Sequence, residues 1–427
     1  MKKLLFAFAS LALISNAVAQ EGADMKWNAE MRFRFTNTEN EGFDKSANDN
    51  ETQQRTKIGA TMTKGEDLTA TVTLLNASTW GNAGAGNTSG ELISNGSDSE
   101  IYVYEAFAFW KAMDNFALKI GRGALDLADG SVIAKNDWEQ TPWSFEGAYG
   151  AYFTEWANIG LFGVKGMNDE SGATVGGNTA DINFYGLSVD VKNLPEWLKM
   201  VNIHALQSKA TGVGGTLGFD EKLRLGLTVK GDSSAVDYRL SYAMYDGETS
   251  VGGTADHEAS MLDAEVGFSM PDVMNMRISA LYHMDSGSSA TATKNETYDA
   301  FFYERHANAG LMDIIGWGNS TYIKVGVALE PMEMTKVGLD YYMFTKTEKD
   351  DSVYNYSATS GTGNLTAIAG TAGTDDDVGS EIDVWATKML SNGAELNARL
   401  GFFQAGDAFG TSPEDITQAS LGATFRF

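Results

Sequence analysis

The sequence predicts an all-β protein, a transmembrane antiparallel up-and-down β-barrel of about eighteen strands, and three observations support this prediction. Apolar and polar residues alternate with a period of two in many segments. The alternating stretches have the roughly ten-residue length that a tilted membrane-spanning strand requires. The links between them are alternately long and short. Sixteen strands are an alternative, because the alternation is weakest over residues 101–111, 145–153 and 156–166.

The first residues have the layout of a secretory signal. Lys2 and Lys3 precede an apolar run from Leu4 to Ile14, and the small residues of Ala17-Val18-Ala19 follow it. This run is too short to span a bilayer as a helix, although an uncleaved anchor is the alternative. We therefore expect residues 1–19 to be removed and residues 20–427 to form one barrel domain.

The first strand shows the alternation most clearly. Its odd positions from Met25 to Phe35 are all apolar, whereas the even positions from Lys26 to Arg34 are polar or charged. Such a period of two places all the apolar side chains on one face of a strand, whereas a helix would distribute them around its circumference. The same pattern recurs at residues 222–230, 262–270 and 418–427.

The order of the links distinguishes a membrane barrel from a soluble β-sandwich. Outer-membrane barrels have short turns at the periplasmic rim and long loops at the extracellular rim, whereas a soluble sandwich has no reason to sort its links. The predicted short turns span residues 63–67, 112–115, 192–197, 231–235, 270–274, 330–334 and 390–394. The predicted long loops span residues 37–52, 77–100, 122–143, 167–181, 208–220, 246–260, 285–320, 347–379 and 405–414. This sorting favours an outer-membrane location, in contact with lipid and lipopolysaccharide.

Composition excludes several other classes of protein. The chain carries 57 acidic and 31 basic side chains, and this acidity argues against binding to nucleic acid. There is no cysteine, and we find neither a phosphate-binding glycine loop nor a histidine pair with metal-ligand spacing. We therefore expect no cofactor and no metal.

The predicted inward face of the strands is mildly basic, although the whole chain is acidic. Basic side chains outnumber acidic ones at the polar positions of the clearer strands, and rings of Lys and Arg favour anions in channels. Pairing of charges across strands is the alternative explanation for any single residue. The alternation predicts the pore-lining residues Arg34, Lys57, Arg224, Arg239, Arg277, Lys324, Lys336, Asp383 and Arg399.

Three segments resemble the alginate-export-like family of outer-membrane channels. They are Ile120-Gly121-Arg122 with Asp126, Asp129-Gly130 and Asp137-Trp138; Tyr298-Asp299 with His306, Gly310-Leu311-Met312-Asp313 and Gly316-Trp317; and Gly379, Glu381-Ile382-Asp383, Leu400-Gly401-Phe402-Phe403 and Gly406. Gly123 and Ser131 stand where the family has Gln and Arg.

The resemblance implies an eighteen-strand barrel with a porin-like role. It also implies that Arg122 and Asp129, in the third long loop, narrow the pore. The terminal Phe427, with Phe425 before it, is similar to the last-strand signature that the barrel assembly machinery reads. The function predicted is therefore passage of polar solutes, including anionic or sugar-type molecules.

Two other functions are alternatives. A structural or adhesive barrel would have a filled lumen and long loops that bind a partner. A hydrolase with a site at the rim is the other alternative, but His283 near Asp285 has no serine in a triad arrangement in the sequence. We therefore expect a channel and not an enzyme.

Overall fold

The structure is a computed structural model, and it describes residues 23–45, 47–80, 101–128, 130–167, 181–213, 218–249, 255–300, 302–304, 306, 308–356, 365–410 and 413–427. The predicted signal, residues 1–19, lies outside the described residues, and so does Asp129. The described residues contain no helix that is both long and apolar enough to cross a membrane.

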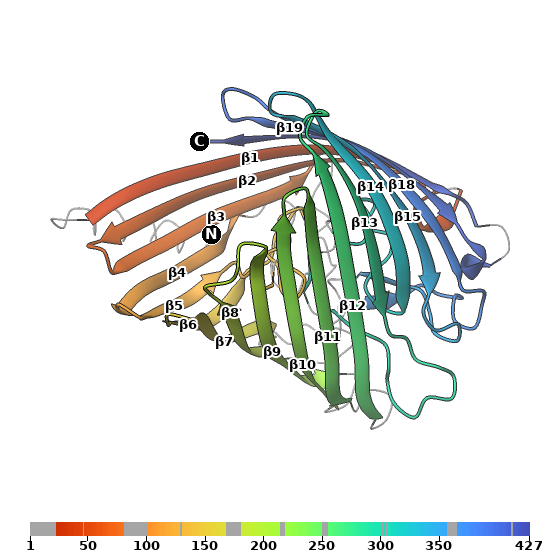
Figure 1. The fold of residues 1–427 in the computed structure, drawn as a ribbon, viewed down its shortest axis with the longest axis horizontal. Helices are drawn as coiled ribbons and strands as arrows, with labels where there is room; N and C mark the ends of the chain where they lie inside the picture. Colours follow the sequence, from red (N-terminus) through yellow and green to blue (C-terminus); the bar gives the residue numbers. More distant parts are fainter. Residues whose placement is uncertain are drawn as a thin grey trace.

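Eighteen antiparallel strands form one closed sheet, which confirms the predicted number. Each strand pairs with its neighbours along the chain, and the first strand also pairs with the last, so that the barrel closes. Figure 1 shows the strands side by side in chain order, with the amino-terminal strands in red and the carboxy-terminal strands in blue. The strands are β1 Ala23–Glu39, β2 Asp49–Lys64, β3 Leu68–Thr79, β4 Ile101–Met113, β5 Phe116–Gly123, β6 Phe145–Phe153, β7 Ala157–Met167, β8 Asp181–Val191, β9 Leu198–Val213, β10 Gly218–Ser233, β11 Val236–Thr249, β12 Ala255–Met270, β13 Met276–Asp285, β14 Ser320–Met332, β15 Thr335–Lys346, β18 Asp377–Met389, β19 Glu395–Ala405 and β20 Ile416–Arg426.

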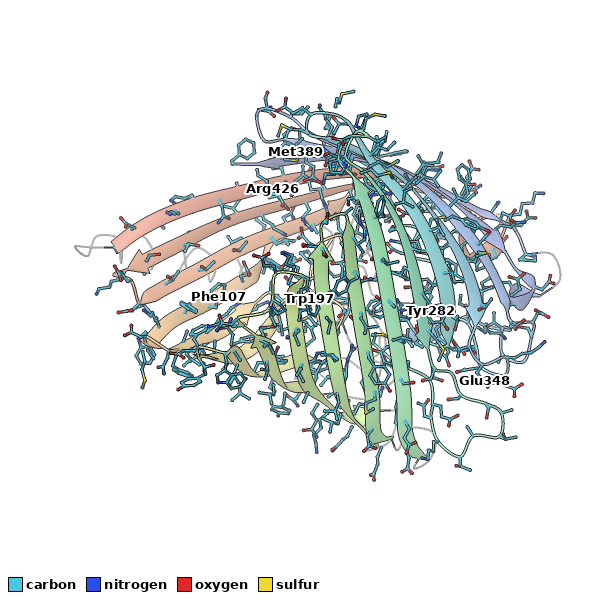
Figure 2. All side chains as sticks on the ribbon, in the orientation of Figure 1. Phe107, Trp197, Tyr282, Glu348, Met389 and Arg426 are labelled. Carbon is cyan, nitrogen blue, oxygen red and sulfur yellow. The ribbon has the colours of Figure 1, made fainter. Side chains whose placement is uncertain are left out.

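The two faces of the sheet are the reverse of those in a soluble barrel. Trp27 and Ile58 are 56% and 49% exposed on the outer face, whereas Arg55 is 1% exposed on the inner face. Tyr282, labelled in Figure 2, belongs to the same outward set on β13. Because a lipid-facing surface must be apolar and a lumen can be polar, this arrangement is that of a membrane barrel.

Links at the two rims differ in length as predicted. Short turns join pairs of strands at one rim, and the residues Ser234 and Met334 in two of these turns have positive φ angles of 59° and 55°. Long loops lie at the opposite rim, and they contain the short strands β16 Tyr354–Tyr356 and β17 Leu365–Ala367 and the 3-10 helices η1 Glu41–Phe43 and η2 Asp407–Phe409. The short-turn rim is periplasmic and the long-loop rim extracellular in outer-membrane barrels.

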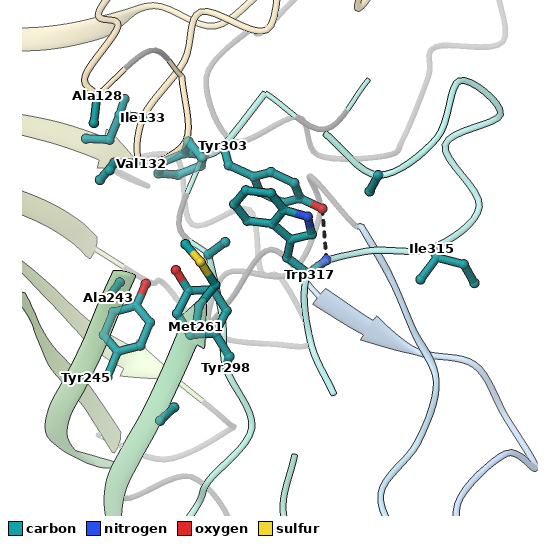
Figure 3. Close-up of a cluster of buried hydrophobic side chains, with 14 of the residues drawn as sticks. Ala128, Val132, Ile133, Ala243, Tyr245, Met261, Tyr298, Tyr303, Ile315 and Trp317 are labelled. Atoms are coloured by element: carbon teal, nitrogen blue, oxygen red, sulfur yellow. Dashed lines mark hydrogen bonds between the residues drawn. The ribbon is translucent and has the colours of Figure 1, made fainter. Parts of the chain in front are cut away.

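Two of the long loops fold into the barrel. Inner loop 1 is residues 124–144, between β5 and β6, and inner loop 2 is residues 286–319, between β13 and β14. They are joined by backbone hydrogen bonds from Ala134 N to Phe302 O (2.7 Å) and from Glu304 N to Gly130 O (2.8 Å). Together they build a buried apolar cluster within the barrel, part of which Figure 3 shows around Tyr303 and Trp317. The lumen is therefore narrowed by the chain itself.

Candidate functional site: the constriction inside the barrel

Arginines of the first two strands hold the tip of inner loop 1. Arg32 donates to the carbonyl oxygens of Asp137 and Glu139, both at 2.7 Å. Arg55 donates to the same two carbonyl oxygens, at 2.8 and 3.0 Å. A carbonyl oxygen satisfies a guanidinium N–H without cancelling its charge, so the positive charge of Arg32 persists at this level of the lumen.

Carboxylates partly neutralise the positive charges of Arg55 and Lys57. Arg55 Nη2 lies 2.7 Å from Glu30 Oε1, and Lys57 Nζ lies 2.7 Å from Asp137 Oδ1. Burial alone would raise the pKa of Asp137, but the charges of Arg55 and Lys57 outweigh it and hold that pKa at about 2. Asp137 is therefore ionised throughout the physiological range, and it fixes inner loop 1 to β2.

Trp138 lies at the centre of the constriction and contacts three planar side chains. The guanidinium carbons of Arg34 and Arg399 lie 4.0 and 3.8 Å from the centre of its ring. The His306 ring stacks on it with centroids 3.9 Å apart and an interplanar angle of 7°. Arg34 also donates to the Trp138 carbonyl (2.9 Å) and to Gln53. The indole thus brings Arg34 of β1 and Arg399 of β19 together at the same level of the lumen. These two strands flank the last strand, β20.

Inner loop 2 places the charge of Asp313 within range of Arg34 and Arg399, whereas Glu304 lies among other acidic groups. Burial, reinforced by Asp313 and Glu139, raises the pKa of Glu304 to about 7. Burial lowers the pKa of His306 to about 4, although its Nδ1 lies 3.1 Å from Asp313 Oδ2. At neutral pH His306 is therefore an uncharged aromatic surface, and Glu304 is close to half ionised.

A pair of carboxylates on β18 anchors inner loop 2. Glu381 Oε1 accepts from the amides of Leu311 (2.8 Å) and Met312 (3.1 Å), and Asp383 Oδ2 accepts from Leu311 (3.1 Å). The loop approaches so closely that a Cβ on Gly310, whose φ is +92°, would lie 2.5 Å from Glu381 Oε1. Only glycine fits at position 310 without displacing Glu381. The predicted residue Asp383 anchors inner loop 2 to the inner wall through its bond with Leu311.

The opposite wall is an ion-pair network. Arg239 lies 2.9 Å from Asp263, and Arg277 lies 3.0 Å from Glu265. Lys324 lies 4.0 Å from the same Glu265 carboxylate. Because each of these predicted cations faces a carboxylate, their charges are largely cancelled. These three cations therefore add little net positive charge to this part of the wall.

His283 forms part of a buried bridge between strands. Its Nε2 lies 2.9 Å from Asp285 Oδ2, and its Nδ1 lies 3.2 Å from Asp263 Oδ2. The Ser320 hydroxyl donates to Asp285 Oδ2 (3.1 Å) and not to the His283 imidazole. A nucleophilic triad requires the serine to bond to the histidine, so these three groups do not form one. The residues join β12, β13 and β14 beneath inner loop 2.

A cavity lies between the constriction and the short-turn rim. It has a volume of about 550 Å³ and is lined by Lys57, Tyr104, Glu105, Asp137 and Arg426, among others. Lys336 lies further toward this rim, where its side chain is 65% exposed and its Nζ lies 3.2 Å from Glu330 Oε1. The cavity gives the constriction a polar vestibule on the periplasmic side.

Arg122 does not lie at the constriction. It belongs to β5, in phase with the outward Ile120, and it pairs across strands with Glu146 (Nη1 to Oε1, 2.8 Å). The prediction that Arg122 narrows the pore therefore placed it wrongly, because the strand extends to Gly123 and carries Arg122 onto the outer face. Arg224 has the predicted inward orientation but is 1% exposed beneath inner loop 2.

The predicted residues fall into three groups. Arg34, Lys57 and Arg399 meet at the constriction; Arg239, Arg277 and Lys324 form the ion-pair network; Asp383, Arg224 and Lys336 lie apart from both. The alternation of apolar and polar residues does not predict the roles of Trp138 and Glu381. The signal that could have identified them is the family resemblance, because its segments include Asp137-Trp138 and Glu381-Ile382-Asp383.

A closed eighteen-strand barrel with an apolar exterior, a polar lumen and inner loops that build a charged constriction defines a porin-like outer-membrane channel protein. The family model described as alginate export matches residues 22–421. The chain belongs to this family.

Solved structures from Pseudomonas aeruginosa share the fold. OccK11 (OpdR) is 12% identical and aligns with a TM-score of 0.62 over 95% of this chain and 96% of its own. OccK9 (OpdG) is 12% identical, with a TM-score of 0.62 over 95% and 98% of the two chains. OpdK, solved with vanillate, is 11% identical, with a TM-score of 0.60 over 95% and 98%. A comparison with curated protein sequences finds no match.

Proposed function

We propose that the barrel is a diffusion channel for small anionic and polar solutes, which are selected at the constriction around Trp138. One observation carries the proposal: the cations there are held mainly by carbonyl oxygens and an aromatic ring. Arg32 and Arg34 donate to backbone carbonyls of inner loop 1, and Arg399 lies on the indole with its Nη1 lacking a hydrogen-bond partner among the described residues. Arg32 and Arg34 are only 8% and 7% exposed, so we infer that their charges attract an anion through the electric field in the lumen and not by direct contact.

One of the similar solved structures supports small anions as the class of solute. OpdK was solved with vanillate, a small molecule that carries a carboxylate. In this chain Ser131, which stands where the resembling family has an arginine, donates its hydroxyl to the Ala128 carbonyl (2.7 Å). A neutral residue at this position weakens the attraction for a polyanion, and we therefore propose small solutes in preference to a long polyuronate.

Ion selectivity in planar bilayers tests the proposal. Purified full-length barrel in a tenfold gradient of potassium chloride should give open steps and a reversal potential that shows preference for chloride. Arg34→Gln and Arg399→Gln should each reduce this preference. The matched control is Lys336→Gln, which removes a cation from the exposed rim and should leave selectivity nearly unchanged. A preference for potassium would contradict the proposal.

A structural barrel with a filled lumen is the second candidate. The observation in its favour is the apolar cluster within the barrel, where Ile133, Phe302 and Trp317 are almost fully buried. The bilayer experiment separates the two candidates, because a filled barrel gives no open steps at any voltage.

The membrane contacts follow from the outer surface and the chain end. We propose that the outward side chains contact lipid and lipopolysaccharide, and that Phe427 is read by the barrel assembly machinery. Phe427 is 78% exposed, and its backbone pairs with Ala29 (N to O, 2.9 Å). Deletion of Phe427 should lower the yield of folded barrel in the outer membrane while the purified variant still refolds in detergent. An unchanged yield would contradict the proposed role.

A further inference from the structure

Inner loop 2 crosses the inner face of β10 at Tyr298 and Asp299. Lys222 Nζ lies 3.0 Å from Asp299 Oδ2, and the two side chains are only 7% and 11% exposed. The Tyr245 hydroxyl donates to the backbone carbonyl of Asp299. A carboxylate of the chain is therefore held on the wall by a buried ammonium.

Arg224 lies two residues further along the same face, and no ion pair joins it to a carboxylate among the residues that the structure describes. It is 1% exposed, and its guanidinium carbon lies 5.8 and 6.0 Å from the rings of Tyr298 and Tyr245. Its Nε and Nη1 have no hydrogen-bond partner among the described residues. The Tyr298 ring lies with its centroid 5.1 Å from that of Tyr245, and Figure 3 shows both side chains. A buried guanidinium lacking acceptors is costly, and its preferred partner is a planar oxyanion.

We propose that Lys222 and Arg224 form a binding site for small carboxylates, which the chain's own Asp299 occupies at rest while the Tyr298 ring covers it. The spacing argues for this class of ligand. Residues two apart on one strand face lie about 7 Å from each other, so one carboxylate can satisfy Lys222 while a second reaches Arg224. A dicarboxylate thus fits the pair better than Asp299 alone does. The inference rests on the proposed function for the route by which the ligand reaches the site.

Competition with Asp299 sets the concentration of free carboxylate that is needed to occupy the site. A tethered group acts at an effective concentration in the millimolar range. A free carboxylate with the same intrinsic affinity must exceed that range to displace inner loop 2 in the wild type. Removing the Asp299 charge abolishes the competitor, and we expect the apparent affinity to rise at least about tenfold.

Equilibrium dialysis of radiolabelled succinate against the full-length barrel in detergent tests the site. Asp299→Asn should bind succinate at least about tenfold more tightly than the wild type, and adding Lys222→Gln or Arg224→Gln should reverse the gain. The matched control is Asp246→Asn, which makes the same change of net charge at an exposed position, opposite Leu223 in the outward register of β10 and β11. Equal affinity of Asp299→Asn and Asp246→Asn would overturn the proposal.

The wild type provides an independent measurement, should the Asp299→Asn barrel fail to fold. Succinate at concentrations well above the millimolar range should accelerate amide hydrogen exchange at residues 298–300 as the loop is displaced. Unchanged exchange at saturating succinate would overturn the proposal. Neither measurement requires ion flow, so a barrel that gives no current would refute the proposed function while leaving this site testable.

Discussion

Arg55→Met is the substitution that tests most directly how the constriction is held. The side chain is almost completely buried, and methionine preserves its apolar stem while removing the charge and every donor. Arg55 Nη2 and Nε lie 2.7 and 3.2 Å from Glu30 Oε1, and its Nη1 lies 2.8 and 3.0 Å from the carbonyls of Asp137 and Glu139. The substitution therefore weakens the attachment of the tip of inner loop 1, which Arg32 and Lys57 still hold, and it leaves Glu30 without its main partner.

The expected loss in the free energy of unfolding follows from these contacts. Removing one partner of a buried ion pair costs about 3–5 kcal/mol. Lys57 and Arg426 stay 3.8 and 3.6 Å from the Glu30 carboxylate and compensate in part, so we expect a loss near 3 kcal/mol. The control is Lys336→Met at the exposed rim, for which a loss of at most about 1 kcal/mol is expected.

The assay is urea unfolding of the barrel in phospholipid vesicles, followed by tryptophan fluorescence. The same variant in planar bilayers should show a larger and noisier current, because inner loop 1 is then held to β2 only through the ion pair of Lys57 with Asp137. A loss in the free energy of unfolding below about 1 kcal/mol, with an unchanged current, would refute the idea that these hydrogen bonds hold the loop.

Three further predictions concern charge, the indole and the lipid-facing surface. Because the pKa of Glu304 is raised to about 7, lowering the pH from 8 to 6 neutralises it and should increase the preference for anions; Glu304→Gln should abolish this pH dependence, and a variant that retains it would show that another group titrates. Trp138→Ala removes cation–π contacts worth about 0.5–2 kcal/mol each, and it should release Arg34 and Arg399, with lower anion preference in a salt gradient; unchanged selectivity would contradict the positioning role. Leu225→Arg, in the middle of β10 and 45% exposed on the outer face, should cost about 2–4 kcal/mol in vesicle unfolding, and a negligible cost would contradict its contact with lipid.

The fold could be predicted because its signals are local. The alternation from Met25 to Phe35 assigns each side chain to lipid or lumen, and the sorted link lengths give the sidedness of the barrel. The structure confirms eighteen strands, including those over residues 101–111 and 145–166, where the alternation is weak. There the small residues Ala and Gly reduce the contrast between the two faces, but the cross-strand hydrogen bonds still require a strand.

The constriction was only partly predictable, because it depends on loops that fold back into the barrel. Arg34, Lys57 and Arg399 could be placed on the inner face by parity alone. No local pattern shows that Trp138 contacts Arg34 and Arg399, since those contacts join residues more than a hundred positions apart. Arg122 could have been placed correctly, because it is in phase with the apolar Ile120.

The position of Trp138 has a consequence for the integrity of the barrel wall. Its two arginine partners come from β1 and β19, which flank β20 on either side at the place where the chain closes on itself. The indole is thus a non-covalent cross-link spanning this seam from within. Lateral separation of β20 from β1 or β19 must break these stacking contacts, so a barrel that has not yet closed also lacks the arrangement of Arg34, Trp138 and Arg399.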